Sequence, residues 1–131
     1  MLPQKNRLRH LRDFDSLLKQ GKFVSGTLVT AKVWLIDPLK YPRRAYTKDD
    51  LKIAVVVSMK VSKSAVVRNR VKRQLREVVR LLLKEDKVRH GFLISIMAKG
   101  DIVGKEYADI EKSILELFRR GQLFNTVQND K

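Results

Sequence analysis

The chain has 131 residues, 44% of them hydrophobic, which predicts one folded domain over residues 1–124 followed by a polar tail over 125–131. Its net charge of +15 and isoelectric point of about 10.4 indicate a polyanionic partner, with nucleic acid favoured over an acidic membrane surface. The lack of cysteine excludes disulfides, thiolate zinc sites and thiol nucleophiles, and the lack of a signal-peptide pattern or a membrane-span pattern predicts a cytoplasmic protein.

The first third of the chain predicts a helix followed by β structure and a loop. Apolar residues at helical spacing predict a helix over residues 7–20, which Gly21 ends. Residues 23–36 are rich in β-branched and aromatic residues, and their second half alternates between two faces. Residues 37–50 contain two prolines and mixed charge and predict a long loop. The two faces of the alternating stretch carry Val29, Ala31, Val33 and Leu35 on one side and Thr30, Lys32 and Trp34 on the other.

The rest of the chain predicts alternating strands and helices. Apolar runs at 51–59 and 92–98 predict strands, a basic segment from about Ser64 to Lys84 predicts a helix between them, and 105–120 predicts a last helix ended by Gly121. The order α-β-β-β-α-β-α predicts an α+β two-layer sandwich, in which helices cover a small mixed sheet.

The basic segment "VVRNRVKRQLREVVRLLLK" carries seven basic side chains and one acidic one. At about 100° per residue its apolar side chains cluster within about 80°, and a polar set covers about 120° of the opposite side. We call this polar set the basic stripe; its members are Asn69, Lys72, Arg73, Arg76, Arg80 and Lys84.

A run of charge is often only a solvated helix face, but such faces usually mix charge signs at i, i+4 spacing. The stripe instead places like charges four residues apart, as in Lys72–Arg76 and Arg76–Arg80. Between Lys60 and His90 there are eleven basic residues against three acidic ones. Phosphates would offset this repulsion, and arginine suits bidentate phosphate contacts, so the helix is predicted to bind nucleic acid.

The block "AVVRNRVKRQLRE", Ala65 to Glu77, resembles the signature of the bacterial ribonuclease P protein subunit, which centres on Arg-Asn-Arg, Lys-Arg and Arg-Glu. The stretches "RLRHLRDFDSLLKQG", "IAVVVSMKVSKSA" and "ILELFRRGQLF" are similar to the family's first helix, the strand before the signature and the last helix. The resemblance covers most of residues 6–124.

This resemblance implies a subunit of the endoribonuclease that removes the 5′ leader from precursor tRNA. Its RNA subunit performs the hydrolysis with bound Mg²⁺, and the protein supports that RNA and binds the leader, with no organic cofactor and no obligate protein partner. It also implies a left-handed β-α-β crossover, against the general right-handed rule. The residues implied to bind the RNA subunit are Lys60, Lys63, Arg68, Asn69, Arg70, Lys72, Arg73, Arg76 and Arg80.

The resemblance also implies a leader-binding cleft between the first helix and the sheet, with Phe14, Lys32 and Trp34 as its candidate residues. A ring beside a cation can stack a base and attract a phosphate. The alternative for Phe14 and Trp34 is packing of the first helix on the sheet. Leu18 and Lys32 occupy positions that are often or sometimes aromatic in the family, which predicts weaker stacking and a stronger electrostatic contact.

No catalytic or metal-binding residue is predicted in the protein itself. The two histidines, His10 and His90, stand in charged neighbourhoods, and neither has the spacing of a metal pair. The alternative function is that of a basic ribosomal protein with a purely structural role on rRNA. A DNA-binding regulator would need a helix-turn-helix pair, which the sequence does not indicate.

Overall fold

The computed structural model describes residues 2, 6–8, 17, 19, 21–36 and 50–124. Phe14, most of the predicted loop 37–50 and the tail 125–131 lie outside the described residues. The elements are β1 (Lys22–Ser25), β2 (Val29–Leu35), β3 (Leu51–Val56), α2 (Ala65–Lys84), β4 (Phe92–Ala98), the 3-10 turn η2 (Gly100–Ile102) and α3 (Tyr107–Arg120).

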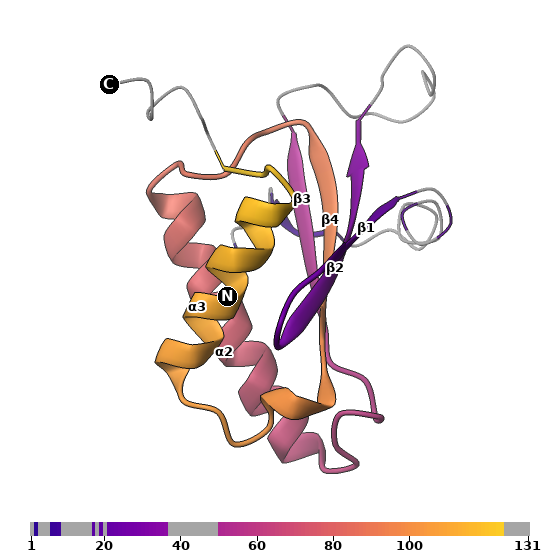
Figure 1. The fold of residues 1–131 in the computed structure, drawn as a ribbon, viewed down its shortest axis with the longest axis vertical. Coiled ribbons are helices and arrows are strands. Elements are labelled where there is room, and N and C mark those ends of the chain that lie inside the picture. The colour runs from indigo at the N-terminus through magenta and orange to yellow at the C-terminus, as the bar shows by residue number, and fades with distance from the viewer. Residues whose placement is uncertain are drawn as a thin grey trace.

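The four strands form one mixed sheet in the order β1-β2-β4-β3, as the ribbon in Figure 1 shows. β2 is antiparallel to both β1 and β4, whereas β3 and β4 run parallel. Because α2 connects these two parallel neighbours, the predicted β-α-β unit is present. The left-handed sense of its crossover stays a prediction.

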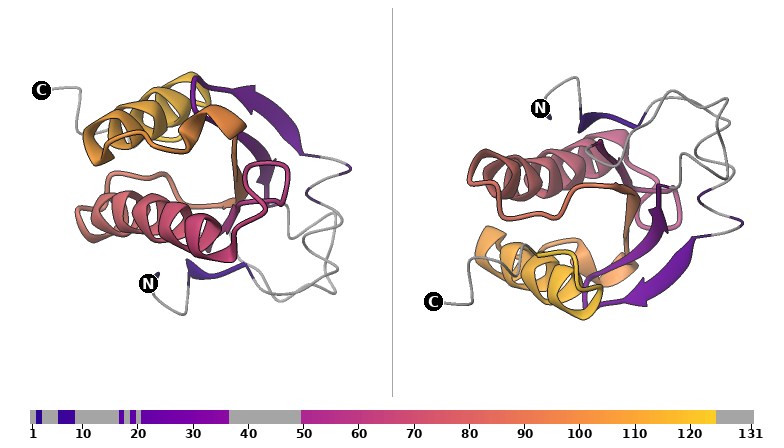
Figure 2. Two further views of the ribbon diagram at one scale, coloured as in Figure 1. Left: turned by 90° about the horizontal axis from the view of Figure 1, so that it is seen from below. Right: turned by 90° about the horizontal axis from the view of Figure 1, so that it is seen from above.

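Both described long helices, α2 and α3, lie side by side on one face of the sheet (Figure 2). Alternation along the strands sends every second side chain toward these helices, so Ala31, Val33, Ile94 and Ile96 are buried in the main core. On α3 the apolar residues Ile110, Ile114, Leu117 and Phe118 are buried, whereas Tyr107 is 36% exposed. The α+β sandwich with a helix-covered mixed sheet is confirmed.

Residues 23–36 form two strands, β1 and β2, which with β3 are the three strands expected before the basic helix. Gly26 to Leu28 make the turn, and β1 folds back on β2 so that Phe23 pairs with Lys32. Gly26 suits this turn, because a Cβ there would lie 2.6 Å from the carbonyl oxygen of Val29.

The predicted start of the first helix at residue 7 is wrong. Arg7 forms a parallel bridge with Ile53, and the Leu8 amide donates to the Ile53 carbonyl at 3.1 Å. The side chain of Asn6 donates to the Leu51 carbonyl at 2.8 Å. β3 is an edge strand, so these contacts provide hydrogen-bond partners for backbone groups that no neighbouring strand pairs with. Later, at Leu17 and Lys19, the chain is helical.

A second, smaller apolar cluster lies on the sheet face opposite to α2 and α3, which we call the outer face. It contains Leu8, Leu17, Ile36 and Leu93, with Trp34 packed against it. Gly21 follows the helical residues as predicted: its amide donates to the Leu17 carbonyl at 2.8 Å, so close that a Cβ at Gly21 would come within 2.4 Å of that oxygen. Among the described ranges, no helix has the length and apolar character needed to cross a bilayer.

Candidate nucleic-acid interface

The start of α2 is held by side chains of the preceding segment. Ser64 is the N-cap, and its hydroxyl accepts a hydrogen bond from the Val67 amide at 3.3 Å. The hydroxyl of Ser62 in turn accepts from the Ser64 amide at 3.1 Å. This segment carries Lys60 and Lys63, both exposed beside the first turn of the helix. The cap therefore fixes where the signature residues begin.

The basic stripe lies opposite to the buried face of α2. The buried residues are Val71, Leu75, Val78, Val79 and Leu82. They lie on one face of the helix, as the 3.6-residue period predicts, and Val67 is half-buried. In the stripe, Asn69, Arg73 and Lys84 are exposed, and Lys72, Arg76 and Arg80 are half-buried. α2 therefore presents a cationic surface to solvent along its length.

Arg68 and Arg70 do not share one surface, because two residues of helix correspond to a rotation of about 200°. Arg70 is exposed, whereas Arg68 is half-buried and its guanidinium donates to the Ser62 carbonyl at 2.9 Å. Arg68 thus ties the 58–64 segment to the helix. The structure separates these two residues of the Arg-Asn-Arg triplet, and only Asn69 between them lies on the stripe.

Arg80, a member of the stripe, is paired with Glu77 of the same helix. Its guanidinium makes two hydrogen bonds with the Glu77 carboxylate, at 2.7 and 3.0 Å. This pairing lowers the pKa of Glu77 below its ordinary value of 4.5 and raises the pKa of Arg80. Glu77 is the only acidic residue of α2, so one cation of the stripe has a carboxylate partner in the same helix.

Lys32 and Trp34 both project from β2 onto the outer face, as the alternation predicts. Trp34 is half-buried and packs on the small outer cluster, so packing is part of its role. Lys32 is half-buried, and its Nζ lies 5.9 Å from the centroid of the Phe23 ring. The structure therefore brings Lys32 and Trp34 to one face, while the predicted partner Phe14 is outside the described residues.

Two residues of the outer face were not indicated by the sequence pattern. Phe23 lies directly opposite Lys32 in the β1–β2 pairing and is 55% exposed. Lys52 on β3 pairs with Leu93, which pairs with Trp34, so Lys52 lies in the same row as Trp34. Both placements depend on the register between strands, which local periodicity does not reveal. Among the described residues, the strands thus carry two rings and two cations on the outer face.

Across the described part of the chain, no three His, Cys, Asp or Glu side chains come together as a metal site. His90 is exposed, with its Nε2 3.4 Å from Asp86 Oδ1, and it lies in the loop after α2. His10 is outside the described residues.

Comparison with known proteins decides between the classes of basic RNA-binding protein. The family model for ribonuclease P matches residues 2–122, which is nearly the whole chain. This chain belongs to the ribonuclease P family. Among similar curated ribonuclease P protein components, that of Clostridium acetobutylicum is 37% identical over 120 residues, covering 92% of each chain. That of Rippkaea orientalis is 30% identical over 123 residues, covering 93% of this chain and 91% of the relative.

The fold of this ribonuclease P family member is also that of solved relatives. The structure of the RNase P protein of Staphylococcus aureus superposes with a TM-score of 0.72, covering 91% of this chain and 97% of that one at 20% identity. At that identity the likeness establishes the fold, and the sequence matches establish the family.

Proposed function

We propose that this protein is the protein subunit of the ribonuclease P ribonucleoprotein, the endoribonuclease that removes the 5′ leader from precursor tRNA. Its basic stripe, with Lys60, Lys63 and the signature arginines beside it, binds the RNA subunit. The outer sheet face binds the single-stranded leader. Membership of the ribonuclease P family supports the assignment to this enzyme. The presence of two separate surfaces supports separate binding of the RNA subunit and of the leader.

The observation that carries this proposal is the surface charge of α2. Lys72–Arg76 and Arg76–Arg80 place like charges at i, i+4, and each such pair costs a few tenths of a kcal/mol in an isolated helix. Phosphate groups along the stripe would remove this cost and supply charge-assisted hydrogen bonds. A helix that already packs an apolar face on the core has no structural need for such a stripe, so a polyanion is its best explanation.

We assign the phosphodiester hydrolysis to the RNA subunit and its Mg²⁺ ions. The single carboxylate of α2, Glu77, accepts two hydrogen bonds from Arg80 and has a lowered pKa, so it is a poor general base. The protein's part is to bind and orient: cations neutralise phosphates of the folded RNA, and rings beside cations hold the unpaired leader.

The test begins with the RNA that co-purifies with the tagged full-length protein. Ribonuclease P RNA is the expected companion, and enrichment of rRNA in its place would support a ribosomal role and refute the proposal. Binding of the protein to that RNA is then measured across a salt series. We expect log Kd to change linearly with log salt, because each phosphate contact releases counterions.

Single substitutions locate the contact on α2. Arg73→Ala and Arg76→Ala should each weaken RNA binding by about ten-fold or more, since a hydrogen bond to a charged group is worth about 1.5–3 kcal/mol. The matched control is Arg119→Ala, an exposed arginine on α3, which should bind normally. Equal effects at Arg73 and Arg119 would mean that net charge, not the stripe, determines binding.

A further inference from the structure

Arg68 begins the Arg-Asn-Arg triplet of the signature, but its angle on α2 is that of the buried face. Leu75 and Val79, seven and eleven residues further along the helix, lie within about 20° of Arg68, and both are fully buried. Arg73, an exposed arginine of the basic stripe, lies about 140° away from it. Arg68 is half-buried, so its side chain is directed toward the body of the protein rather than along the stripe.

The guanidinium of Arg68 holds a peptide unit of the segment that precedes α2. It donates a hydrogen bond to the Ser62 carbonyl at 2.9 Å, and a bond from a charged donor is stronger than one between neutral groups. That carbonyl belongs to the planar peptide unit that joins Ser62 to Lys63. The bond therefore fixes the backbone from which Lys63, an exposed lysine, projects.

The other hydrogen bonds described within the 58–64 segment are local. The Val61 amide donates to the Ser58 carbonyl at 3.0 Å, which closes the turn that carries Lys60. The Ser64 amide donates to the Ser62 hydroxyl at 3.1 Å. Val61 also packs against the main core. The Arg68 bond reaches across six residues, so it ties this locally ordered segment to the first turns of α2.

We propose that Arg68 is a positioning residue of the RNA interface, which holds the 58–64 segment so that Lys60 and Lys63 meet phosphates of the RNA subunit together with the basic stripe. Ordering both lysines before binding lowers the entropy lost when the complex forms. This role rests on the proposed function and refines it, because it separates Arg68 from the arginines that contact the RNA themselves.

The experiment is a double-mutant cycle on the binding of the full-length protein to ribonuclease P RNA. Arg68→Ala should weaken binding by about five-fold, which is within the range for coupled residues. In a Lys60→Ala/Lys63→Ala background the same change should weaken binding less than about two-fold, because the groups that Arg68 positions are gone. Arg70→Ala is the matched change within the triplet. Arg70 is exposed, so its loss should be the same in both backgrounds.

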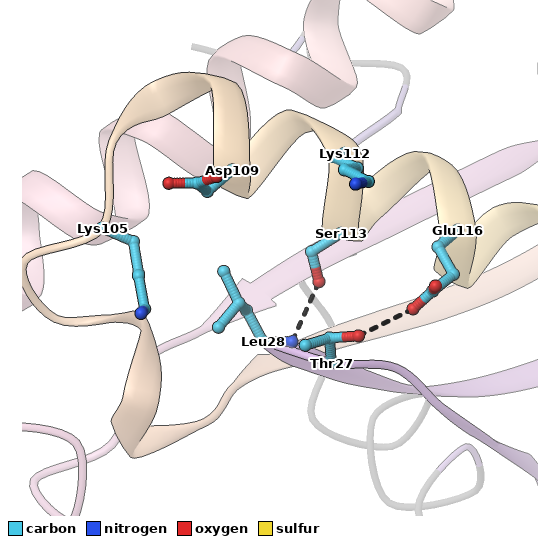
Figure 3. A pocket seen from close by; sticks show the side chains of 7 residues that line it. All are labelled: Thr27, Leu28, Lys105, Asp109, Lys112, Ser113 and Glu116. Atoms are coloured by element: carbon cyan, nitrogen blue, oxygen red, sulfur yellow. Dashed lines mark hydrogen bonds between the residues drawn. The ribbon is translucent and has the colours of Figure 1, made fainter.

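A salt series separates positioning from direct contact. In the background that lacks Lys60 and Lys63, Arg68→Ala should leave the slope of log Kd against log salt unchanged. Loss of a direct phosphate contact would reduce that slope by about 0.7–0.9. The control is Lys112→Ala, which should keep wild-type affinity and slope. Lys112 is exposed on α3 and lines a pocket between this helix and the turn of the β1–β2 hairpin (Figure 3).

Hydrogen exchange in the free protein measures the tie without RNA. The amides of Val61 and Ser64 donate the local hydrogen bonds of the segment, and both should exchange faster in Arg68→Ala than in the wild type. If Arg68→Ala reduces protein yield, Arg68→Met keeps the aliphatic part of the side chain without the donor and is expected to give the same results.

Equal losses for Arg68→Ala in both backgrounds, or a reduced salt slope in the background without the two lysines, would replace the positioning role with a direct phosphate contact. The absence of any loss would overturn the proposal as well, and in all these cases the proposed function stands. A wild-type protein that does not bind ribonuclease P RNA would refute the proposed function, and with it this role of Arg68.

Discussion

The two buried serines, Ser95 and Ser113, give a paired prediction of opposite sign. Ser95 on β4 is fully buried, and among the described residues its hydroxyl is the one buried side-chain polar atom without a hydrogen-bond partner. An unsatisfied buried polar group costs about 1–3 kcal/mol, whereas alanine fills nearly the same space. Ser95→Ala should therefore stabilise the protein by about 1 kcal/mol.

Ser113 on α3 is 4% exposed, but its hydroxyl accepts the hydrogen bond from the Leu28 amide at 2.9 Å. Ser113→Ala leaves that amide unsatisfied, at a cost of about 1–3 kcal/mol. The better helix propensity of alanine returns about 0.5 kcal/mol. The net expectation is a loss of about 0.5–2.5 kcal/mol, from a substitution that is chemically identical to the first.

Thermal and urea unfolding of the purified full-length variants measure both effects. For a chain of this length, a change of about 1 kcal/mol moves Tm by roughly 3–5 °C. We expect Tm to rise for Ser95→Ala and to fall for Ser113→Ala. A fall for both variants would show that the Ser95 hydroxyl is satisfied in solution, and that the reasoning from its missing partner is wrong.

Two further predictions concern α2. Leu75 is fully buried, so Leu75→Ala should lower the free energy of unfolding, measured by urea titration, by about 2–5 kcal/mol. A loss below about 1 kcal/mol would contradict the described packing of α2 on the sheet. Glu77→Gln removes the carboxylate that pairs with Arg80, so it should tighten binding to ribonuclease P RNA and steepen its salt dependence; unchanged binding would mean that Arg80 does not contact the RNA. In the wild type the pKa of Glu77 is lowered, so the pair is complete at neutral pH and is lost only as pH falls through that lowered value.

The local pattern of apolar residues was sufficient to predict the bounds of the helix α2 and the strand β4. α2 runs from Ala65 to Lys84 and β4 from Phe92 to Ala98, close to the predicted ranges. Apolar residues that recur every 3.6 positions are compatible with a helix and with little else, and a short apolar run bounded by turns is typical of a buried strand. The basic stripe was predicted from the same helical spacing of about 100° per residue. The family was also evident in the sequence, through the signature block on α2.

Only the tertiary structure decided features that depend on contacts between distant segments. The pairing of Arg7 with Ile53 follows from the open edge of β3, and no local pattern around residue 7 shows it. Arg68 differs from Arg70 because a carbonyl of the preceding segment lies within reach of its guanidinium.

The outer face shows the same division between sequence and structure. Alternation along residues 29–35 predicted that Lys32 and Trp34 share a face, since side chains two apart on a strand point the same way. That Phe23 stands beside Lys32 required the register of β1 on β2, and a shift of one residue would have turned its ring into the main core. Register is set by the turn at Gly26 to Leu28 and its hydrogen bonds to α3, about 85 residues away in sequence, and such long-range contacts are physically absent from any local window of the chain.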